Sequence, residues 1–595
     1  MKAFSKLTRN YKDCTPDETI DKINLILKKC RLVIDRKCWT KFISGLYSVR
    51  IESTNPSFGT NGKGRSRKYT LASAYAEYME RLQNNLIVLG KPMRKFLLDK
   101  IKTKTGFYYY PDEVEFSYDE FIKLPKQLMQ ELMNFENQIN DEKIKDIFEV
   151  KNGFKHTLIA VPFYNTSSDS VIYIPLNMVF SITGSTGMAA GNTIEEAIYQ
   201  ALCEILERYS AAKIYFEQLT PPTISNDFLK KFPKEYKLIE EIRSIGTHVE
   251  IKDFSCGKGF PSVGIIVYDK NKKNYRLNVG TDSCFQVALS RCLTEILQGY
   301  ESAEEWLGNF LPVPQKEFSY FSSNDIVSSR ARNREYENFT INGNGVFPYT
   351  LFQKSESYPF NEHTFHSQKN YKEEIKTLKK LFEDLGSDLY IRNVSFLGFP
   401  SVYVYATNVS VLTGKNVNPS INNYDTTINE NMYNIDKLLN NNSNLLLPNF
   451  VKEIANLYSE SLSKIENSYL EDVFRLKFSD DHIMSKLPLS FLLFLNNFHN
   501  KDYDGALRYY NIAIKLLQAE DNAFFKGLRN YIQSIKNGII DETSEYNRMM
   551  QKNLLTILDL PNCPHCYKCK LKLHCETIQD VNTQIRLIKK IITVR

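Results

Sequence analysis

The stretch Glu204-Ile205-Leu206-Glu207-Arg208 repeats the pattern of Glu77-Tyr78-Met79-Glu80-Arg81, and a shorter relative follows at Glu295-Ile296-Leu297-Gln298. Glutamates three residues apart lie on one face of an α-helix, so each pair can direct two oxygen ligands to one place. The neighbouring residues are mostly apolar or small, which leaves the acids beside a buried stripe where each needs a partner. Such pairs suit Mg²⁺, and the alternative is a solvated helix face with i,i+4 charge pairs.

Glycine-rich segments precede the first two of these helices. Gly59-Thr60-Asn61-Gly62-Lys63-Gly64 lies before Glu77, and residues 184–192 carry three glycines before Glu204. Glycines let backbone N–H groups approach an anion, and the N-terminus of a following helix adds a favourable dipole. We therefore expect a nucleotide held by these loops, with Mg²⁺ bridging its phosphates to the glutamates.

Strand-like and helical patterns alternate from about Cys38 to Leu412. Thr193-x-x-Glu196 reads as a capping box before a helix over 194–216, and Ser283-x-x-Gln286 reads as another before a helix near residue 283. The repeated strand-strand-helix unit predicts an α+β domain with antiparallel sheets and long helices. No Gly-x-x-x-x-Gly-Lys-Ser/Thr occurs, which excludes an ordinary P-loop. The predicted strands include Val171–Ile174, Val263–Tyr268 and Val402–Tyr405.

The pattern divides the chain into four parts. Residues 1–420 hold the α+β domain, whose core is about 40–412, and residues 421–449 form an Asn-rich linker. Residues 450–550 form an all-α domain, in which Tyr503–Ile514 reads either as part of a tetratricopeptide-type unit or as an ordinary helical hairpin. Residues 551–595 form a basic tail.

The tail contains Cys563, Cys566, Cys569 and Cys575 within a short span. This spacing indicates four thiolate ligands for a metal, and both Zn²⁺ and a [4Fe–4S] cluster accept such a set. The alternative is a group of free thiols. The other seven of the 11 cysteines are scattered, which is consistent with reduced thiols in a cytoplasmic protein.

The composition limits the class of protein to which the chain can belong. The 595 residues are 42% hydrophobic, as in a folded protein, and the net charge of +7 is too mild to imply nucleic-acid binding by the whole chain. The first residues lack the apolar core of a leader, and no uncharged apolar run approaches the ~18 residues that span a bilayer. We therefore expect a cytoplasmic location and no membrane partner.

Six motifs occur in this order along the chain: Asn61–Gly64, Leu71–Arg81, Tyr173–Pro175, Gly187–Thr193, Glu204–Arg208 and Arg291–Gly299. Taken together, they closely resemble the YcaO family. The total length and the helical C-terminal region look most like its stand-alone members, which are described as accessory factors for methylthiolation of a small-subunit ribosomal protein. The resemblance implies a YcaO-type ATP-binding domain and a homodimer.

Family members use ATP and Mg²⁺ to phosphorylate the oxygen of a backbone amide, which a nucleophile then attacks. The resemblance implies Mg²⁺ ligands at Glu77, Glu80, Glu204, Glu207 and Glu295. It implies ATP contacts at Lys63, Asn192, Glu196, Arg208 and Arg291. Each of these residues could instead have a purely structural role, as Arg291 and Glu295 would if they formed an i,i+4 ion pair with each other.

The expected function is therefore ATP-dependent activation of a peptide or protein amide, as an accessory to ribosomal-protein methylthiolation. The expected partners are the substrate, a radical methylthiotransferase and the ribosome. One alternative is a thioamide- or azoline-forming modifier of a small ribosomal peptide. The chain lacks the Pro-rich end common in azoline-forming members, which disfavours azoline chemistry and leaves the general base unassigned. The other alternative is a non-catalytic scaffold that recruits partners through its helical tail and cysteine module.

Overall fold

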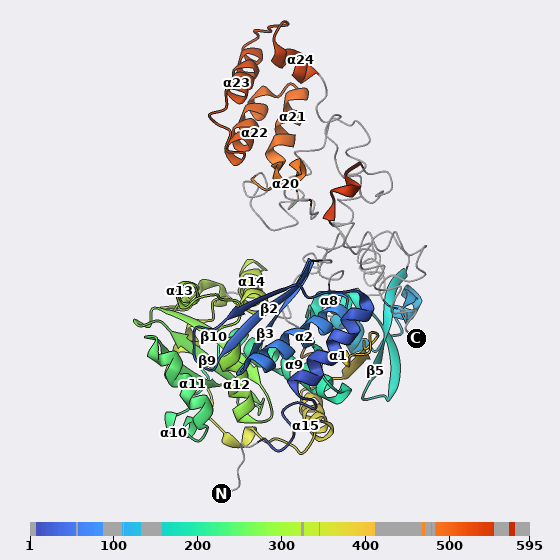
Figure 1. Cartoon of the computed structure of the whole chain (residues 1–595), viewed down its shortest axis with the longest axis vertical. Helices are drawn as coiled ribbons and strands as arrows, with labels where there is room; N and C mark the ends of the chain where they lie inside the picture. Colours follow the sequence, from blue (N-terminus) through green and yellow to red (C-terminus); the bar gives the residue numbers. More distant parts are fainter. Residues whose placement is uncertain are drawn as a thin grey trace.

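The protein, described by a computed structural model, has two parts that differ in secondary structure (Figure 1). The residues that the structure describes are 7–54, 57–86, 110, 112–132, 157–322, 326–343, 345–410, 467–470, 478, 482–551 and 570–576. Helices and sheets alternate up to residue 410, and the described residues from 482 onward are helical. The predicted α+β class with a helical C-terminal region is confirmed.

Three sheets form the α+β part, and all their strand pairs are antiparallel, as predicted. The first sheet has the order β1 (Arg36–Thr40), β2 (Tyr47–Thr54), β3 (Ser57–Gly64). The second has the order β11 (Leu311–Pro312), β10 (Asn274–Thr281), β9 (Ser262–Tyr268), β8 (His248–Asp253). The third has the order β4 (Val114–Ser117), β5 (Thr157–Asn165), β12 (Leu389–Asn393), β13 (Ser401–Ala406), β7 (Met188–Ala190), and β6 (Ser170–Pro175) pairs with β5 outside that path.

Long helices connect and cover these sheets. Helix α9 (Ile194–Phe216) contacts β7 and β13 of the third sheet and also β9 and β10 of the second, so it lies between two sheets. Helix α2 (Arg67–Gln83) packs on β2 and β3, and α12 (Phe285–Glu295) packs on β9 and β10. The other helices that the structure describes in this part are α1 (Pro16–Cys30), α5 (Tyr118–Phe121), α6 (Lys126–Leu132), α8 (Leu176–Thr183), α10 (Asn226–Leu229), α11 (Pro233–Ser244), α13 (Ala303–Gly308), α14 (Ile326–Asn342) and α15 (Tyr371–Asp384).

The glycine-rich segment before α2 is a strand, so the prediction that Gly59–Gly64 forms a loop is wrong, while the predicted phosphate contact of Lys63 stays a prediction. These residues belong to β3, and Gly62 pairs with Val49 of β2. A Cβ atom on Gly62 would lie 2.2 Å from the carbonyl oxygen of Thr70 in α2. The glycine therefore serves the close packing of a strand on a helix, which needs the same residue type as an anion loop.

A similar contact joins β10 to α12. A Cβ atom on Gly280 would lie 2.6 Å from the carbonyl oxygen of Ala288. The helix that bears Glu77 and the helix that bears Glu295 thus each pack tightly on a preceding strand through a glycine. This packing holds both acids at fixed positions relative to their sheets.

The two predicted capping boxes have different outcomes. The hydroxyl of Thr193 accepts a hydrogen bond from the backbone N–H of Glu196 at 3.2 Å, so Thr193 is the N-cap of α9, but the Glu196 carboxylate turns to other partners. Before α12 the prediction is wrong, because Cys284 is the N-cap and has no side-chain cap bond. Ser283 instead donates to Glu374 of α15 at 2.7 Å, a tertiary contact that local spacing does not reveal.

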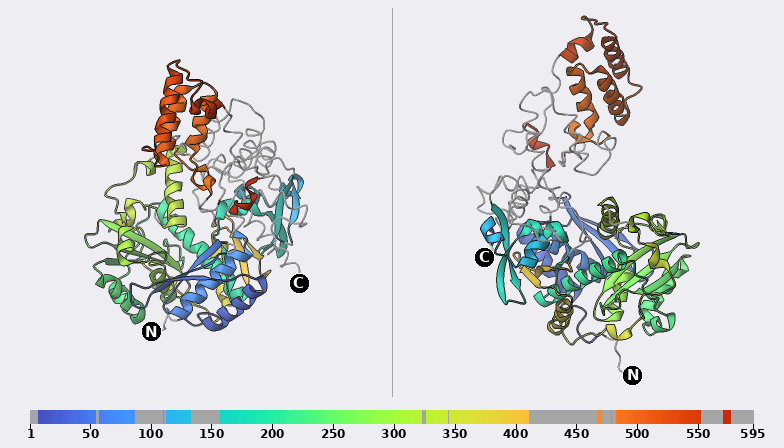
Figure 2. Two further views of the ribbon diagram at one scale, coloured as in Figure 1. Left: turned by 45° about the horizontal axis from the view of Figure 1, so that its top comes forward. Right: turned by 180° about the vertical axis from the view of Figure 1, so that it is seen from behind.

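The C-terminal region is a series of short helices that stands away from the sheets in Figure 1 and in the right-hand view of Figure 2. Its helices are α20 (Ile483–Lys486), α21 (Leu489–His499), α22 (Tyr503–Leu516), α23 (Ala523–Lys536) and α24 (Glu545–Gln551). Neighbouring helices from α21 to α24 pack on one another, so Tyr503–Ile514 lies in a helical hairpin. The predicted linker at 421–449 lies outside the described residues.

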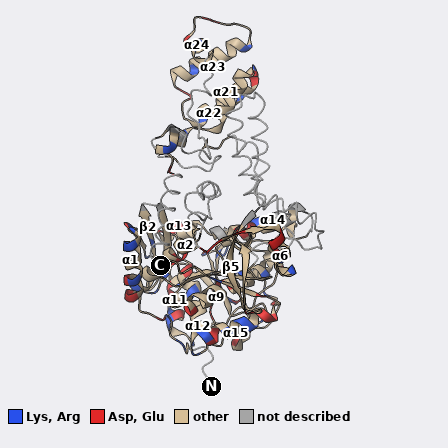
Figure 3. Ribbon diagram, turned by 90° about the vertical axis from the view of Figure 1, so that its right-hand side faces the viewer, with Lys and Arg blue, Asp and Glu red and all other residues tan. Residues whose placement is uncertain are grey.

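The distribution of charge on the surface agrees with the composition. Figure 3 shows basic and acidic residues interspersed around α1, α11, α12 and α15, as expected from a modest net charge. Within the described part of the chain, no helix has the length and apolar character needed to cross a membrane.

Candidate functional site

Three helices carry the glutamates that the sequence singles out. Glu77 and Glu80 lie on α2, Glu204 and Glu207 on α9, and Glu295 is the last residue of α12. The helix faces around them are buried: Tyr78, Met79, Ile205 and Leu206 are all fully enclosed. The acids themselves are half-buried, so they stand at the edge of the core as the sequence predicts.

The electrostatics show that the three helices bring these carboxylates together. Burial raises the pKa of Glu77, and the charges of Glu295 and Glu204 raise it further, while Arg81 and Lys63 oppose the change. Burial raises the pKa of Glu80 strongly, and Glu204 and Glu77 again contribute. Glu77 therefore lies within electrostatic range of carboxylates from both of the other helices.

Glu207 and Glu295 form a coupled pair. Burial and the charge of Glu295 raise the pKa of Glu207 to about 7. Burial also acts to raise the pKa of Glu295, but an ion pair with Lys63 of β3 lowers it below its ordinary value. A single proton on Glu207 relieves the repulsion between two neighbouring acids, and a divalent cation would relieve it in the same way.

Cations of the chain itself occupy the cluster in this structure. Arg81 lies 3.7 Å from Glu77 and 3.4 Å from Glu80, and Lys63 pairs with Glu295. Across the described residues, no group of three or more acidic, histidine or cysteine side chains is arranged to hold a metal ion as it stands. The ligand chemistry fits Mg²⁺, because all five groups are carboxylates, but the carboxylates would have to exchange these partners to bind it.

The second glycine-rich segment contacts this cluster directly. The backbone N–H of Gly187 donates to Glu204 Oε2 at 3.2 Å. Gly187 has a φ of +88°, and a Cβ atom there would lie 2.1 Å from the carbonyl oxygen of Val404. Only glycine allows this turn to bring its N–H to the carboxylate.

The two arginines flank the glutamates on α9 and α12. Arg208 donates to the carbonyl oxygen of Thr340 in α14 at 3.0 Å. Burial acts to lower the pKa of Arg291, but the charge of Glu207 and a smaller contribution from Tyr11 raise it above its ordinary value. Arg291 therefore lies within electrostatic range of both Glu207 and Tyr11 of the N-terminal segment.

Asn192 and Glu196 form a second cluster with that N-terminal segment. Glu196 is 2% exposed and lies 3.0 Å from the ammonium group of Lys12. It also accepts from the backbone N–H of Asp13 at 3.0 Å and from Asn192 Nδ2 at 3.2 Å. Burial acts to raise the pKa of Glu196, but Lys12 and these hydrogen bonds lower it. The hydroxyl of Thr19 donates to Asn192 Oδ1 at 2.7 Å.

We call residues 7–15 the N-terminal strap. Arg9 anchors it, with its guanidinium 2.8 Å from Asp282 and 3.2 Å from Glu374. The same group lies 4.7 and 4.6 Å from the ring centres of Tyr199 and Tyr371. The strap therefore crosses to α9 and α15 and joins Glu196 to the rest of the site. Sequence reasoning missed Lys12, Thr19 and Arg9, because their partners lie far away in the sequence and no local pattern marks them.

The predicted cysteine site is largely outside the described residues. Cys563, Cys566 and Cys569 are not described, and Cys575 is half-buried and forms an antiparallel bridge with Phe478. The four-thiolate site therefore stays a prediction.

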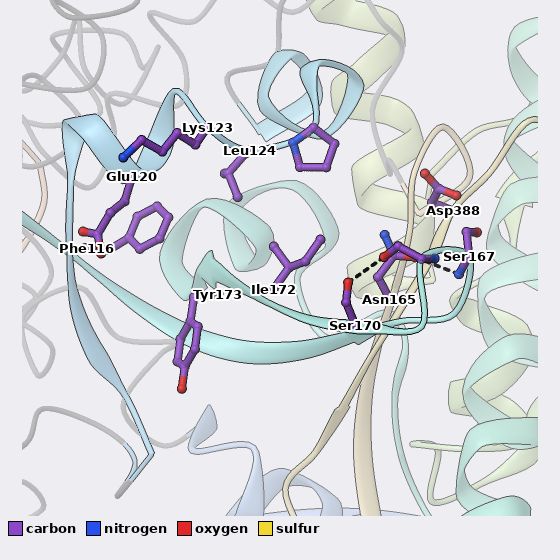
Figure 4. Close-up of a pocket in the computed structure, with 12 residues that line it drawn as sticks. Phe116, Glu120, Lys123, Leu124, Asn165, Ser167, Ser170, Ile172, Tyr173 and Asp388 are labelled. Atoms are coloured by element: carbon purple, nitrogen blue, oxygen red, sulfur yellow. Dashed lines mark hydrogen bonds between the residues drawn. The ribbon is translucent and has the colours of Figure 1, made fainter.

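A cavity of about 720 Å³ lies elsewhere, between α5 and the β5–β6 hairpin (Figure 4). Phe116, Leu124 and Ile172 give it a mostly apolar lining. None of the predicted site residues lines it. We therefore place the candidate site at the glutamate cluster, because of its ligand chemistry, and not at this cavity.

One protein family and several known proteins are similar to this chain. A family model described as YcaO cyclodehydratase, ATP- and Mg²⁺-binding, matches residues 61–410. The Escherichia coli ribosomal protein S12 methylthiotransferase accessory factor YcaO is 28% identical over 403 residues, which cover 67% of this chain and 65% of the relative. A Haemophilus influenzae protein is 26% identical over 478 residues, which cover 78% of this chain and 75% of the relative.

Solved structures with 15% sequence identity also align with the chain. A heterocyclase in complex with substrate and cofactor gives a TM-score of 0.46, covering 69% of this chain and 54% of the other. YcaO from Methanopyrus kandleri bound with AMPPCP and Mg²⁺ gives a TM-score of 0.41, covering 68% and 94%.

Proposed function

The chain belongs to the YcaO family, whose model matches residues 61–410, and on this premise we propose that it uses ATP and Mg²⁺ to phosphorylate the oxygen of a backbone amide in a peptide or protein. One observation carries the proposal: five glutamates from three helices meet beside Lys63, Arg208 and Arg291. That combination of oxygen ligands and cations suits a metal-bound triphosphate.

The chemistry explains why such a site is useful. An amide is a poor electrophile because its carbon is stabilised by the nitrogen lone pair and its oxygen is a poor leaving group. In the proposed step the amide oxygen bonds to the γ-phosphorus, the bond from phosphorus to the β,γ-bridging oxygen breaks, and ADP leaves with that electron pair. The activated carbon can then accept a nucleophile, and the oxygen departs as phosphate.

The residues of the chain would bind and orient the reactants. Glu77, Glu80, Glu204, Glu207 and Glu295 would hold Mg²⁺, which would neutralise charge on the phosphate oxygens. Lys63, Arg208 and Arg291 would contact the phosphates, since the transferred group gains from positive charge and positioning. Asn192 and Glu196, held by the N-terminal strap, would contact another part of ATP.

Binding would require an exchange of partners at Lys63. Its ammonium group pairs with Glu295 in this structure. When a phosphate approaches, Lys63 can turn to it and leave Glu295 free for the metal. The same exchange at Arg81 would free Glu77 and Glu80.

The biological role that we propose is that of an accessory factor in methylthiolation of ribosomal protein S12. Its support is the name of the E. coli relative, which is 28% identical. The chain spans 65% of the length of that relative, so the role rests on the shared part. Reconstitution with S12 and its methylthiotransferase tests this role, and a product that forms equally without the chain would contradict it.

Calorimetric titration of Mg·ATP tests the nucleotide site. We expect saturable binding by the wild-type chain and about tenfold or weaker affinity in Glu204→Gln, the loss of a charged ligand. Glu217→Gln is the matched control, because Glu217 is the C-cap of the same helix α9 and its half-exposed carboxylate pairs with Lys213. Equal affinity in wild type and Glu204→Gln would refute the site.

The alternative of a non-catalytic scaffold makes a different prediction. If the chain acts without ATP, Glu204→Gln supports methylthiolation as well as wild type does. Removal of residues 482–595 would then abolish function. A thioamide- or azoline-forming activity would instead appear as loss or gain of mass in a small peptide and not in S12.

A further inference from the structure

The first sheet ends in a strand whose outer edge is open. β1 is the last strand in the order β1-β2-β3, and among the described residues it pairs with β2 alone. The first three residues of β1 are exposed, and the last two are half-buried. The outward N–H and C=O groups of such an edge strand can pair with a strand from another chain.

The sequence around β1 is strongly basic. Residues 28–41 hold six basic residues and one acidic residue, whereas the whole chain has 76 and 69. Within the described part of the chain, no ion pair joins any of the six to a carboxylate. Figure 3 shows basic residues along the side where β2 and α1 lie. Unpaired positive charge at a surface favours a partner with negative charge. The six residues, all exposed, are Lys28, Lys29, Arg31, Arg36, Lys37 and Lys41.

The cations of β1 lie on both faces of the sheet. Glu52 is opposite Arg36 in the register of β1 and β2, but the Glu52 carboxylate pairs with Arg50. Arg36 and Lys37 are neighbours in the strand, so their side chains point to opposite faces. A strand added at this edge would therefore meet a positive charge on each face.

The aromatic rings beside β1 are already covered by cations. The guanidinium of Arg67 lies 5.0 Å from the centre of the Trp39 ring, and Nζ of Lys37 lies 5.6 Å from that of Tyr75. Tyr75 is also buried. Single-stranded nucleic acid is held by bases that stack on open aromatic faces. The open strand edge and the covered rings thus favour a peptide over a nucleic acid.

We propose that the outer edge of β1 binds an extended acidic segment of a partner protein as an added antiparallel strand. Backbone hydrogen bonds give the pairing, and acidic side chains opposite Arg36 and Lys37 give the specificity. A second copy of this chain fits less well, because it would bring unpaired cations to both sides of the interface. The inference does not rest on the use of ATP.

The sheet connects this edge to the candidate site. Thr40 of β1 pairs with Ser48 of β2, which pairs with Lys63 of β3. Neighbouring strands lie about 5 Å apart, so the backbone of β1 is roughly 10 Å from that of Lys63. A partner docked on β1 would therefore be held close to the glutamate cluster.

Alkylation of Cys38 tests the docking in the full chain, because Cys38 is exposed in the middle of β1. The probe is the blocked peptide Thr-Val-Thr-Glu-Glu, which in antiparallel register places its glutamates opposite Lys37 and Arg36. We expect it to slow the reaction of Cys38 with iodoacetamide by at least about threefold, as read by mass spectrometry. The peptide Thr-Val-Thr-Lys-Lys should have no effect. N-methylation of the backbone of the acidic peptide should remove its effect, since it removes the hydrogen-bond donors.

Charge reversal separates docking from a general effect on the structure. In Arg36→Glu/Lys37→Glu the acidic peptide should lose its effect and the lysine peptide should gain it, a result that unfolding cannot mimic. Lys234→Glu/Lys237→Glu is the matched control, because both residues are exposed on α11, which packs on the second sheet.

Four outcomes would overturn the proposal. Equal protection by the N-methylated peptide would mean that no strand is added. No protection by either peptide would mean that the basic residues only keep the edge from aggregating. Stronger protection by oligouridylate than by the acidic peptide would assign the edge to single-stranded nucleic acid. A dimer in sedimentation, with alkylation of Cys38 that becomes faster on dilution, would assign it to a second copy.

Discussion

Replacing Arg9 by methionine should destabilise the α+β part more than any other single change on the strap. Methionine keeps an unbranched apolar stem but lacks the guanidinium group, which leaves Asp282 and Glu374 buried without their cation. Their side chains are 3% and 0% exposed. Removing one partner of a buried pair costs about 3–5 kcal/mol, and loss of the contacts with Tyr199 and Tyr371 adds roughly 1 kcal/mol.

Urea unfolding followed by tryptophan fluorescence measures this cost. Trp306 is fully buried in the α+β part and reports on its unfolding. The expected change is a loss of about 5 kcal/mol in the free energy of unfolding. Arg50→Met is the control, because Arg50 is half-exposed and its pair with Glu52 is worth less than about 1 kcal/mol.

A second measurement separates stability from the strap's role at the site. Hydrogen exchange should show residues 7–15 losing protection in Arg9→Met under conditions where α9 stays protected, and the affinity for Mg·ATP should fall. If Arg9→Met unfolds at the same urea concentration as wild type, the contacts of Arg9 contribute nothing to stability and the prediction is wrong.

Three further changes test other parts of the structure. Gly62→Ala should cost roughly 2–4 kcal/mol, because its Cβ would lie 2.2 Å from a backbone oxygen of α2, whereas Gly308→Ala, with open space around it, should be near neutral in the same urea assay. Lys63→Met should bind Mg²⁺ alone more tightly and Mg·ATP more weakly by calorimetry, since it frees Glu295 and removes a phosphate contact; weaker binding of both would contradict the exchange of partners. Burial raises the pKa of Asp253 to about 6, above an unfolded value near 3.9. Ionisation of this buried carboxyl group therefore lowers the free energy of unfolding by about 3 kcal/mol, an effect that is absent near pH 4 and grows as the pH rises to 6. Asp253→Asn should therefore be more stable than wild type at pH 7 and lose that advantage by pH 4.5. If the two proteins differ by the same free energy of unfolding at both pH values, the prediction is wrong.

Patterns of short range predicted much of this fold. The apolar runs at Val263–Tyr268 and Val402–Tyr405 are strands, and the helix predicted over 194–216 is α9. The period of apolar residues is a local property, and burial of one face explains it. The glutamates on α2, α9 and α12 could likewise be found from their spacing.

Contacts of long range could not be predicted in this way. Gly59–Gly64 has the composition of a loop, and only its packing on α2 shows why a strand needs those glycines. Ser283 has the spacing of a cap, but its hydroxyl binds Glu374 in another helix. Lys12 carries no signal at all, since its partner Glu196 is defined only by the folded chain.

The strap also has a consequence for how the protein is made. Arg9 binds Glu374, which the ribosome adds 365 residues later. Asp13 and Lys12 can reach Glu196 early in synthesis, but the anchor that holds them waits until α15 has left the ribosome. A nascent chain that ends before α15 would therefore have the glutamates of α2, α9 and α12 without a fixed strap. The order of synthesis thus delays the complete candidate site until nearly the whole α+β part has emerged, which under the proposed function would limit premature use of ATP by unfinished chains.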